Sequence, residues 1–304
     1  MDAPHWFQRA LDAPSEPGDV VVEGTNIHFE TWGEAGKPGV VLVHGSNAHL
    51  EWWRFVAPYL ADNFRVAALD SSGNGDSGWR PRYSGRLLAD EVWAVCQAAD
   101  LGPKPFVVGH SFGGFVALET GHRHGDALGG IIFLDFTVGP PETYLEWGMR
   151  AVRDDVKAGR KPRVYPDRET IASRFRLIPE QPNVYPGVLR HMVSRGIRQV
   201  EGGWIWKFDP TLFDYLEMGA DQRDKFLGLP CPAAVVLGEN STDEAALYGD
   251  YTAGLKGRDA PLFRIPGAYH HLMFDEPLAV TAAITATLLS WLRAPKPRAV
   301  WGLG

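Results

Sequence analysis

Residues 105–116 read Pro-Phe-Val-Val-Gly-His-Ser-Phe-Gly-Gly-Phe-Val. The apolar run Phe106–Val108 predicts a buried strand, and the residues from Phe115 onward predict a helix. Between them stands a G-x-S-x-G pattern with Ser111 at its centre. A strand that turns sharply into a helix needs glycines where a Cβ would collide with neighbouring backbone. The pattern therefore predicts that Ser111 lies at the apex of such a turn with its hydroxyl exposed. The alternative is a glycine-rich turn with an incidental serine.

The composition of the chain fits a large globular protein and argues against several classes. Its 304 residues are 45% hydrophobic and include eleven tryptophans, which is ample for a core. The net charge of −7, without a long basic run, disfavours a nucleic-acid partner. Cys96 and Cys231 lie in apolar patterns, so we expect no metal cluster and no disulfide framework. No signal-like segment or long apolar span is visible, so we expect a soluble, cytoplasmic protein without membrane contact. The oligomeric state stays open.

Strand-like runs alternate with helical segments along most of the chain. Continuous apolar runs, as in the later strands, are typical of parallel strands covered on both faces. The repeated β-α-β order predicts an α/β fold with a doubly wound, mostly parallel eight-stranded sheet. The expected strands are Val20–Val22, Ile27–Trp32, Val40–Val43, Arg65–Leu69, Phe106–Val108, Gly130–Leu134, Ala233–Leu237 and Leu262–Ile265, and the expected helices span about 51–61, 86–100, 112–124, 243–256 and 276–293.

One long segment interrupts this alternation after the sixth strand. From Thr137 to Leu229 no apolar run resembles a sheet strand, and short amphipathic pieces are separated by prolines. This pattern predicts a helical cap at 137–229 over the carboxyl edge of the sheet, with the core formed by 1–136 and 230–304. Lysine and arginine outnumber acidic residues there, which we interpret as a solvated surface, with attraction of anionic substrates as the alternative. The amphipathic pieces are Tyr144–Val156, Arg168–Leu177 and Val188–Val200.

At the end of the third strand, the sequence His44-Gly45-Ser46 contains a second glycine that allows the backbone to bend sharply. Ligands of open α/β sheets bind beyond the carboxyl ends of the strands, where this stretch lies. A backbone that bends close to a ligand here would let the N–H of Ser46 pair with that of Phe112 as an oxyanion hole. We interpret His44 itself as a structural hydrogen-bonding residue rather than a catalyst.

Two further strand ends carry a carboxylate and a histidine. Asp135 follows the apolar run ending at Leu134, and His270 follows the run ending at Ile265. A serine hydroxyl is a weak nucleophile until a base takes its proton, and the base in turn needs an orienting acid. Ser111, a carboxylate such as Asp135, and His270 supply these three roles in the chain order Ser-Asp-His.

Together these stretches resemble the α/β-hydrolase fold family, over nearly the whole chain from about Val20 to Leu292. The resemblance implies this fold, a hydrolase activity, and no cofactor or metal. The loop that begins at Asp70 resembles a tight family turn, and we interpret it as structural. The matching pieces are Val-His-Gly-Ser-Asn at 43–47, Leu-Asp-Ser-Ser-Gly-Asn-Gly-Asp-Ser at 69–77, Gly-His-Ser-Phe-Gly-Gly at 109–114 and Ile-Pro-Gly-Ala-Tyr-His-His-Leu-Met at 265–273.

The acid departs from the commonest family pattern. In many relatives it follows the next-to-last strand as G-x-x-D, and Ser241 stands at that place here. The stretch Phe-Leu-Asp-Phe around Asp135 instead resembles the haloalkane dehalogenase branch, whose acid lies at the end of the earlier strand. We therefore predict Asp135 as the acid and keep Asp243, and after it Glu239, as alternatives. Asp135 as a mere cap of the following turn is the remaining interpretation.

The nucleophile separates the chain from the chemistry of that branch. Its dehalogenases and epoxide hydrolases use an aspartate where this chain has Ser111, and the halide-binding tryptophan would fall at Phe112. Alkyl halides and epoxides are thus disfavoured, and a serine nucleophile suits acyl transfer. Two histidines, His270 and His271, stand next to each other in the last matching piece. The family pattern Gly-Ala-x-His selects His270 as the base, and His271 is then a packing neighbour.

The aromatic residues suggest the class of substrate. They gather after the oxyanion loop and through the cap, where they either line an apolar pocket or form the core of the cap. We expect a hydrolase that cleaves carboxylic esters, thioesters or lactones of small apolar or aromatic molecules. The alternatives are C–C bond hydrolysis or lyase chemistry on the same scaffold, and a non-catalytic ligand-binding protein. The aromatic set comprises Trp52, Trp53, Trp79, Trp147, Phe175, Trp204, Trp206, Phe208 and Phe213.

Overall fold

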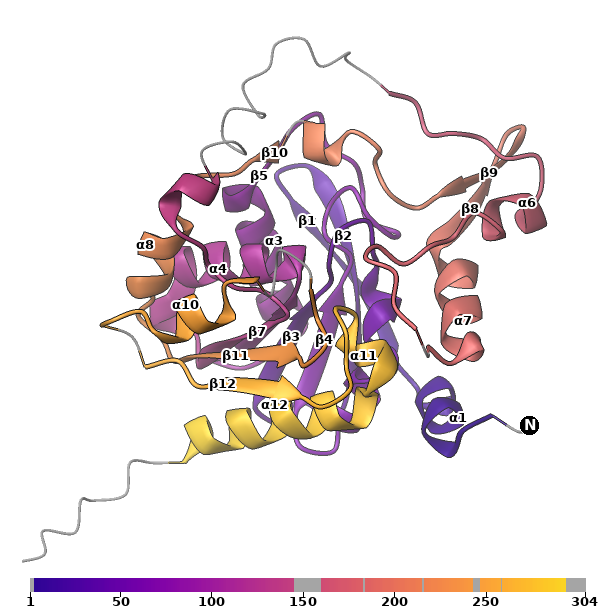
Figure 1. The fold of residues 1–304 in the computed structure, drawn as a ribbon. Coiled ribbons are helices and arrows are strands. Elements are labelled where there is room, and N and C mark those ends of the chain that lie inside the picture. The colour runs from indigo at the N-terminus through magenta and orange to yellow at the C-terminus, as the bar shows by residue number, and fades with distance from the viewer. Residues whose placement is uncertain are drawn as a thin grey trace, which may run out of the picture.

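An eight-stranded sheet forms the centre of the computed structural model, which describes residues 3–144, 160–182, 184–214, 216–242, 247–257 and 259–293 (Figure 1). The strands lie in the order β1-β2-β4-β3-β6-β7-β11-β12. β2 runs antiparallel to β1 and β4, and every other neighbouring pair is parallel. The predicted sheet is confirmed, with each strand at its expected place. The bounds are β1 Glu16–Val22, β2 Thr25–Trp32, β3 Gly39–Val43, β4 Arg65–Leu69, β6 Phe106–His110, β7 Gly130–Leu134, β11 Ala233–Gly238 and β12 Leu262–Ile265.

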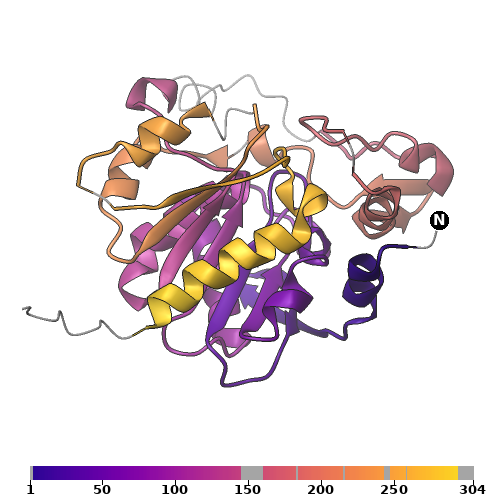
Figure 2. The same cartoon turned by 60° about the horizontal axis from the view of Figure 1, so that its bottom comes forward.

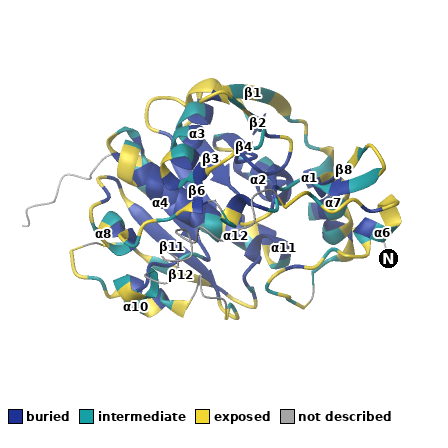
Figure 3. Ribbon diagram, turned by 90° about the horizontal axis from the view of Figure 1, so that it is seen from above, coloured by how far each residue is buried: buried dark blue, intermediate teal, exposed yellow. Residues whose placement is uncertain are grey.

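Helices cover both faces of the sheet because alternate residues of each strand point to opposite sides. Leu42 of β3 packs on the side of α2 (Ala57–Leu60) and α12 (Pro277–Leu292). Its neighbour Val41 packs on the side of α3 (Gly85–Ala98) and α4 (Phe112–His124). Figure 2 shows α12 lying across one face of the sheet, and Figure 3 shows the central strands buried between the helices of the two faces. The uninterrupted apolar runs of the sequence thus supply two cores at once.

The N-terminal helix α1 (His5–Asp12) was not predicted from the sequence. Phe7 on this helix stacks on Phe55, with ring centroids 5.1 Å apart, and meets Tyr185 edge-on at the same distance. Such a short helix is stabilised by burial of its apolar face rather than by its own propensity. The remaining elements around the sheet are η1 Leu50–Trp53, β5 Tyr83–Ser84, η2 Gly125–Ala127, β10 Leu216–Glu217, α8 Gln222–Leu227, α10 Gly249–Ala253 and α11 Leu272–Asp275.

The segment after β7 contains a hairpin that corrects one sequence prediction. The amphipathic piece expected over Val188–Val200 is helical only as far as Gly196, in α7 (Pro186–Gly196). Ile197–Val200 instead forms strand β8, which pairs antiparallel with β9 (Gly203–Trp206) across a two-residue turn. Gly202, with φ of 84°, permits that turn, and Trp-Ile-Trp in β9 favours a strand. The signal of a Gly-Gly turn before an aromatic strand was present in the sequence.

α6 (Arg168–Ala172), α7, β8 and β9 lie together beside the main body, next to α1 (Figure 1). The last part of 137–229 packs differently, because Phe226 of α8 is buried against Phe133 of β7, with ring centroids 5.8 Å apart. Most of the expected piece Tyr144–Val156, with Trp147, lies outside the described residues, as do residues 243–246 of the expected helix 243–256. The division into core and cap stays a prediction. Within the described ranges, no helix combines the length and apolarity needed to cross a lipid bilayer.

Candidate active site

Ser111 sits at the sharp turn between β6 and α4, in a left-handed backbone conformation with φ of 53° and ψ of −122°. The neighbouring glycines are required by close packing. A Cβ on Gly109 would lie 2.1 Å from the carbonyl oxygen of Gly113, and a Cβ on Gly113 would lie 2.3 Å from that of Val43. Both distances are far below van der Waals contact, so the chain can bend here only with glycine at these positions. The bend lifts the Ser111 side chain out of the strand at its carboxyl end.

The structure brings Ser111, His270 and Asp135 together in one chain of hydrogen bonds. The Nε2 atom of His270 lies 3.0 Å from Oγ of Ser111, and its Nδ1 lies 2.7 Å from Oδ2 of Asp135. An ionised carboxylate only accepts hydrogen bonds, so Nδ1 carries the ring proton and Nε2 presents its lone pair to the serine hydroxyl. This is the arrangement in which a histidine can take a proton from a serine.

Asp135 follows β7 in a left-handed conformation, with φ of 45°, and its side chain is fully buried. Its Oδ1 accepts a hydrogen bond from the N–H of Gly238 at 2.9 Å, and its Oδ2 accepts one from the hydroxyl of Ser241 at 2.5 Å. Of the alternative acids, Glu239 accepts a bond from the N–H of Gly267 instead, and Asp243 lies outside the described residues. Ser241, which stands where many relatives carry the acid, is thus a partner of the carboxylate.

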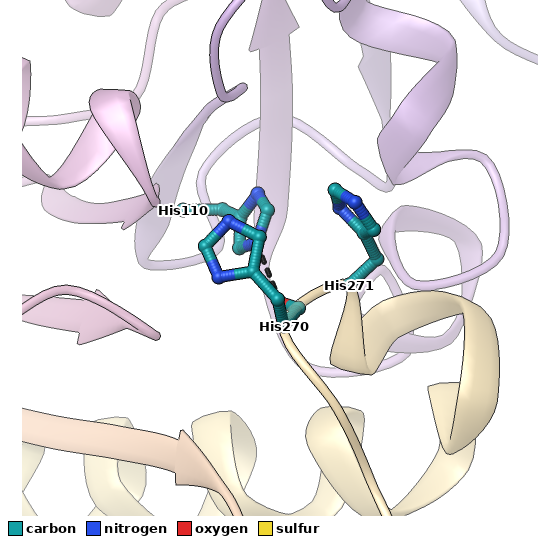
Figure 4. Close-up of side chains that lie close together, drawn as sticks. All are labelled: His110, His270 and His271. Carbon is teal, nitrogen blue, oxygen red and sulfur yellow. Dashed lines mark hydrogen bonds between the residues drawn. The ribbon is translucent and has the colours of Figure 1, made fainter. Parts of the chain in front are cut away.

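Two other histidines surround His270 (Figure 4). Nε2 of His110 donates a hydrogen bond to the backbone oxygen of His270 at 2.8 Å. The ring of His271 packs edge-on against Trp52, with centroids 5.2 Å apart. Burial, followed by the neighbouring His270, lowers the pKa of His110 well below its ordinary value and that of His271 to about 3. Both rings are therefore neutral at neutral pH, and the structure places His270 rather than His271 against Ser111. Sequence reasoning missed His110, because the middle residue of G-x-S is otherwise free to vary.

His110, His270 and His271 form the one group in the described part of the chain that could hold a metal ion, with one ligand atom from each residue lying within 4.8 Å of the others. Both nitrogens of His270 are already committed to Ser111 and Asp135. The cluster fits a catalytic histidine with two packing neighbours better than a metal centre.

Gln181, from the segment between α6 and α7, holds the loop that carries His270. Its Oε1 accepts a hydrogen bond from the backbone N–H of His271 at 2.8 Å, and its Nε2 donates to Asp275 at 2.8 Å. Asp275 in turn accepts a bond from the N–H of Tyr269 at 2.8 Å. Both residues that flank His270 are thus fixed by one amide side chain of the predicted cap and its carboxylate partner. No local pattern in the sequence indicates this contact.

Each of the two predicted oxyanion residues is adjacent in sequence to a residue at the proposed site, Phe112 to Ser111 and Ser46 to Gly45. Phe112 is the first residue of α4, where a backbone N–H has no partner within the helix. Ser46 follows Gly45, whose Cβ, if present, would lie 3.3 Å from that of Ser111. His44 accepts a bond from the N–H of Ser71 at Nε2 and donates to the oxygen of Gly45 from Nδ1, which fits a structural role.

The loop at Asp70 is tied together by the carboxylate of that residue. Oδ1 accepts a hydrogen bond from the N–H of Leu50 at 2.6 Å, and Oδ2 accepts one from the N–H of Asp76 at 2.8 Å. These bonds fit the interpretation of this loop as structural.

The aromatic residues divide between packing and the site. Trp53 is fully buried in the core, and Trp204 and Trp206 pack within the hairpin region. Phe213 differs, because it is 40% exposed and its ring meets that of Phe112 edge-on, with centroids 5.1 Å apart. An exposed aromatic ring beside the residue that follows Ser111 is suited to contact a bound molecule.

Comparisons with known proteins agree with this geometry. Residues 40–284 match the model of the alpha/beta hydrolase family. The chain is 25% identical over 230 residues to "Esterase Rv0045c" of Mycobacterium tuberculosis, covering 73% of each protein. It superposes on the thioesterase domain from the curacin biosynthetic pathway with a TM-score of 0.73 at 22% identity, covering 91% of this chain and 99% of that one. A thermophilic esterase from Thermogutta terrifontis gives a TM-score of 0.66 at 24% identity, covering 92% and 99%. These structural likenesses show the fold.

Proposed function

The chain belongs to the alpha/beta hydrolase family, and from this premise we propose that it is a serine hydrolase that cleaves carboxylic esters, thioesters or lactones. The observation that carries the proposal is the chain of hydrogen bonds from Ser111 through His270 to Asp135. Its three members follow β6, β12 and β7, which are parallel strands whose carboxyl ends lie at the same edge of the sheet. The 25% identity to an esterase agrees with ester hydrolysis.

In the proposed mechanism, Oγ of Ser111 attacks the substrate carbonyl while Nε2 of His270 takes its proton. Asp135 stabilises the imidazolium that forms. The negative charge on the carbonyl oxygen is received by the N–H groups of Phe112 and Ser46, each of which contributes about 10²–10³ in rate. The tetrahedral intermediate then collapses, and His270 returns the proton to the leaving alcohol or thiol. A water molecule, activated by the same histidine, hydrolyses the acyl-enzyme.

We propose small apolar or aromatic acyl groups as substrates. Phe112 and Phe213 form an aromatic corner beside the nucleophile, and Phe136, next to the acid, is only partly buried. An apolar acyl or alcohol group placed against these rings would be removed from water, with a gain of roughly 25 cal/mol per Å². Phe213 belongs to the predicted cap at 137–229, which would thus form one wall of the acyl site, and the bonds of Gln181 to the histidine loop support a placement of this segment beside the site.

A fluorophosphonate probe tests the proposal directly, because it reacts with serines activated by a base. We expect the probe to label the wild-type protein and a Ser194→Ala variant, which loses an exposed serine on α7, but not Ser111→Ala. In parallel, a panel of acyl esters, thioesters and lactones of graded size identifies the bond that is cleaved. Labelling together with cleavage of β-diketones but not esters would favour C–C hydrolysis instead. Absence of labelling would favour a ligand-binding protein.

A further inference from the structure

The acid of the proposed triad is held in place by a side chain from the next strand of the sheet. Ser241 lies three residues beyond the end of β11, which pairs with β7, the strand that ends next to Asp135. The Ser241 hydroxyl donates to Oδ2 of Asp135 at 2.5 Å, and this is the same oxygen that accepts the Nδ1–H of His270. The hydroxyl and the imidazole therefore fix Oδ2 from two directions.

The position of Ser241 is itself well defined. Its backbone N–H donates to the oxygen of Gly238 at 3.2 Å, and the N–H of Asn240 donates to the oxygen of Ala268 at 2.9 Å. The loop that carries Ser241 is thus joined to the loop that carries His270. Because its backbone is already fixed, Ser241 loses little conformational freedom when its hydroxyl bonds to the carboxylate. Most of the free energy of this hydrogen bond therefore serves to orient the Asp135 carboxylate.

The charge on Asp135 has few other partners. The carboxylate is fully buried, and among the described residues its one ion-pair partner is His270, with no lysine or arginine nearby in that role. Besides His270, the donors to it are the N–H of Gly238 and the hydroxyl of Ser241. A buried carboxylate depends on such donors to stay ionised. Loss of one of these donors therefore changes both the orientation of the carboxylate and the proton affinity of the His270–Asp135 pair.

We propose that Ser241 is a positioning residue for the catalytic acid, its hydroxyl holding the ionised Asp135 carboxylate against His270. This inference rests on the proposed function, in which Asp135 must be ionised and His270 neutral at the start of each turnover. Without the hydroxyl, the carboxylate becomes a stronger proton acceptor and favours the protonated histidine. Activity then fails at a higher pH than in the wild-type protein.

The test compares Ser241→Ala and Ser241→Cys with Ser241→Thr. Cysteine keeps a similar size but offers only a weak donor, whereas threonine keeps the hydroxyl. A hydrogen bond to a charged group is worth roughly ten- to a hundredfold in an equilibrium constant. We expect Ala and Cys to lower kcat/KM about tenfold and to move the acidic limb of its pH profile up by about one pH unit. Threonine retains most of the activity and the wild-type profile. Thr242→Ala, which removes an exposed hydroxyl from the same loop, is the matched control.

A second measurement needs no substrate. The pH titration of the His270 ring, followed by NMR, should move to higher pH in Ser241→Ala and not in Thr242→Ala. Unchanged profiles and an unchanged ring titration in both the Ala and Cys variants would overturn the inference, even if the wild-type protein is an active esterase. A shifted titration in a protein that no fluorophosphonate labels would instead support the role of Ser241 and refute the proposed function.

Discussion

Replacement of Asp135 by asparagine perturbs the site most selectively, because the amide has the size of the carboxylate. One amide atom must remain an acceptor for the N–H of Gly238, so the oxygen takes the place of Oδ1. The NH₂ group then occupies the place of Oδ2, where it meets the Nδ1–H of His270 and the hydroxyl of Ser241. A donor now faces a donor, and the mismatch is relieved only if the proton of the imidazole moves to Nε2.

That change of tautomer disables the base. With Nε2 protonated, His270 can donate to Ser111 but cannot take its proton. Loss of the correct tautomer in a serine triad costs about 10⁴ in kcat, which corresponds to about 5 kcal/mol of transition-state stabilisation. We therefore expect Asp135→Asn to retain about 10⁻⁴ of the wild-type kcat on a chromogenic ester, with fluorophosphonate labelling slowed to a similar degree.

Two other carboxylates serve as controls for this assignment. Glu239→Gln changes a neighbouring acid that bonds to the N–H of Gly267, and Asp243→Asn changes the alternative acid outside the described residues. Both variants should keep activity within a few-fold of wild type, and circular dichroism should show that all three variants are folded. If Asp135→Asn stays within tenfold of wild type while one of the controls is inactive, the acid has been assigned to the wrong strand.

Three further predictions concern stability, pH and substrate choice. Ser111→Gly should be inactive like Ser111→Ala but more stable than it by about 1 kcal/mol in chemical denaturation, because glycine accepts the left-handed φ; equal stabilities would contradict this. Burial lowers the pKa of His44 to about 4 and those of His49 and His271 to about 3. The unfolded chain protonates these histidines near pH 6.5, whereas the folded chain does not. Each histidine should therefore lower the free energy of unfolding by about 2 kcal/mol as the pH falls from 7 to 5. His49→Gln should make the free energy of unfolding depend less steeply on pH over this range. Phe213→Ala should raise KM severalfold for aromatic esters and leave acetate esters unchanged, and equal effects on both would show that the ring only packs.

The strands and the sharp turn at Ser111 could be predicted because each depends on residues that are close together in the sequence. Continuous apolar runs such as Val40–Val43 mark strands that are buried on two faces, and glycines on both sides of Ser111 mark a bend that no larger residue fits. His270 could be placed because its loop resembles that of a known family. These features need no knowledge of distant partners.

The features that the sequence did not reveal depend on long-range contacts. Gln181 reaches the histidine loop 90 residues away, and His110 bonds to a backbone oxygen 160 residues away. The strand at Ile197–Val200 was mistaken for helix because its two apolar residues are spaced as on one helix face, although the glycines and the aromatic strand that follow indicate a hairpin. α1 forms because its aromatic face finds Phe55 and Tyr185, which lie far along the chain.

The backbone strain at this site also bears on how the protein would respond to laboratory evolution. Five described residues other than glycine have a left-handed φ, and three of them, Asn47, Ser111 and Asp135, adjoin or belong to the proposed machinery. Each such conformation costs on the order of 1–2 kcal/mol, against a total stability of about 5–15 kcal/mol for a typical domain. A screen for heat resistance alone would thus favour glycine at 111, where the side chain that is lost bonds, among the described residues, only to His270. Glycine at 135 would instead leave the N–H of Gly238 and the hydroxyl of Ser241 without their buried acceptor, so relief of the strain there brings no net gain. The survivors would be robust and inert, so selection must score turnover and thermal tolerance together.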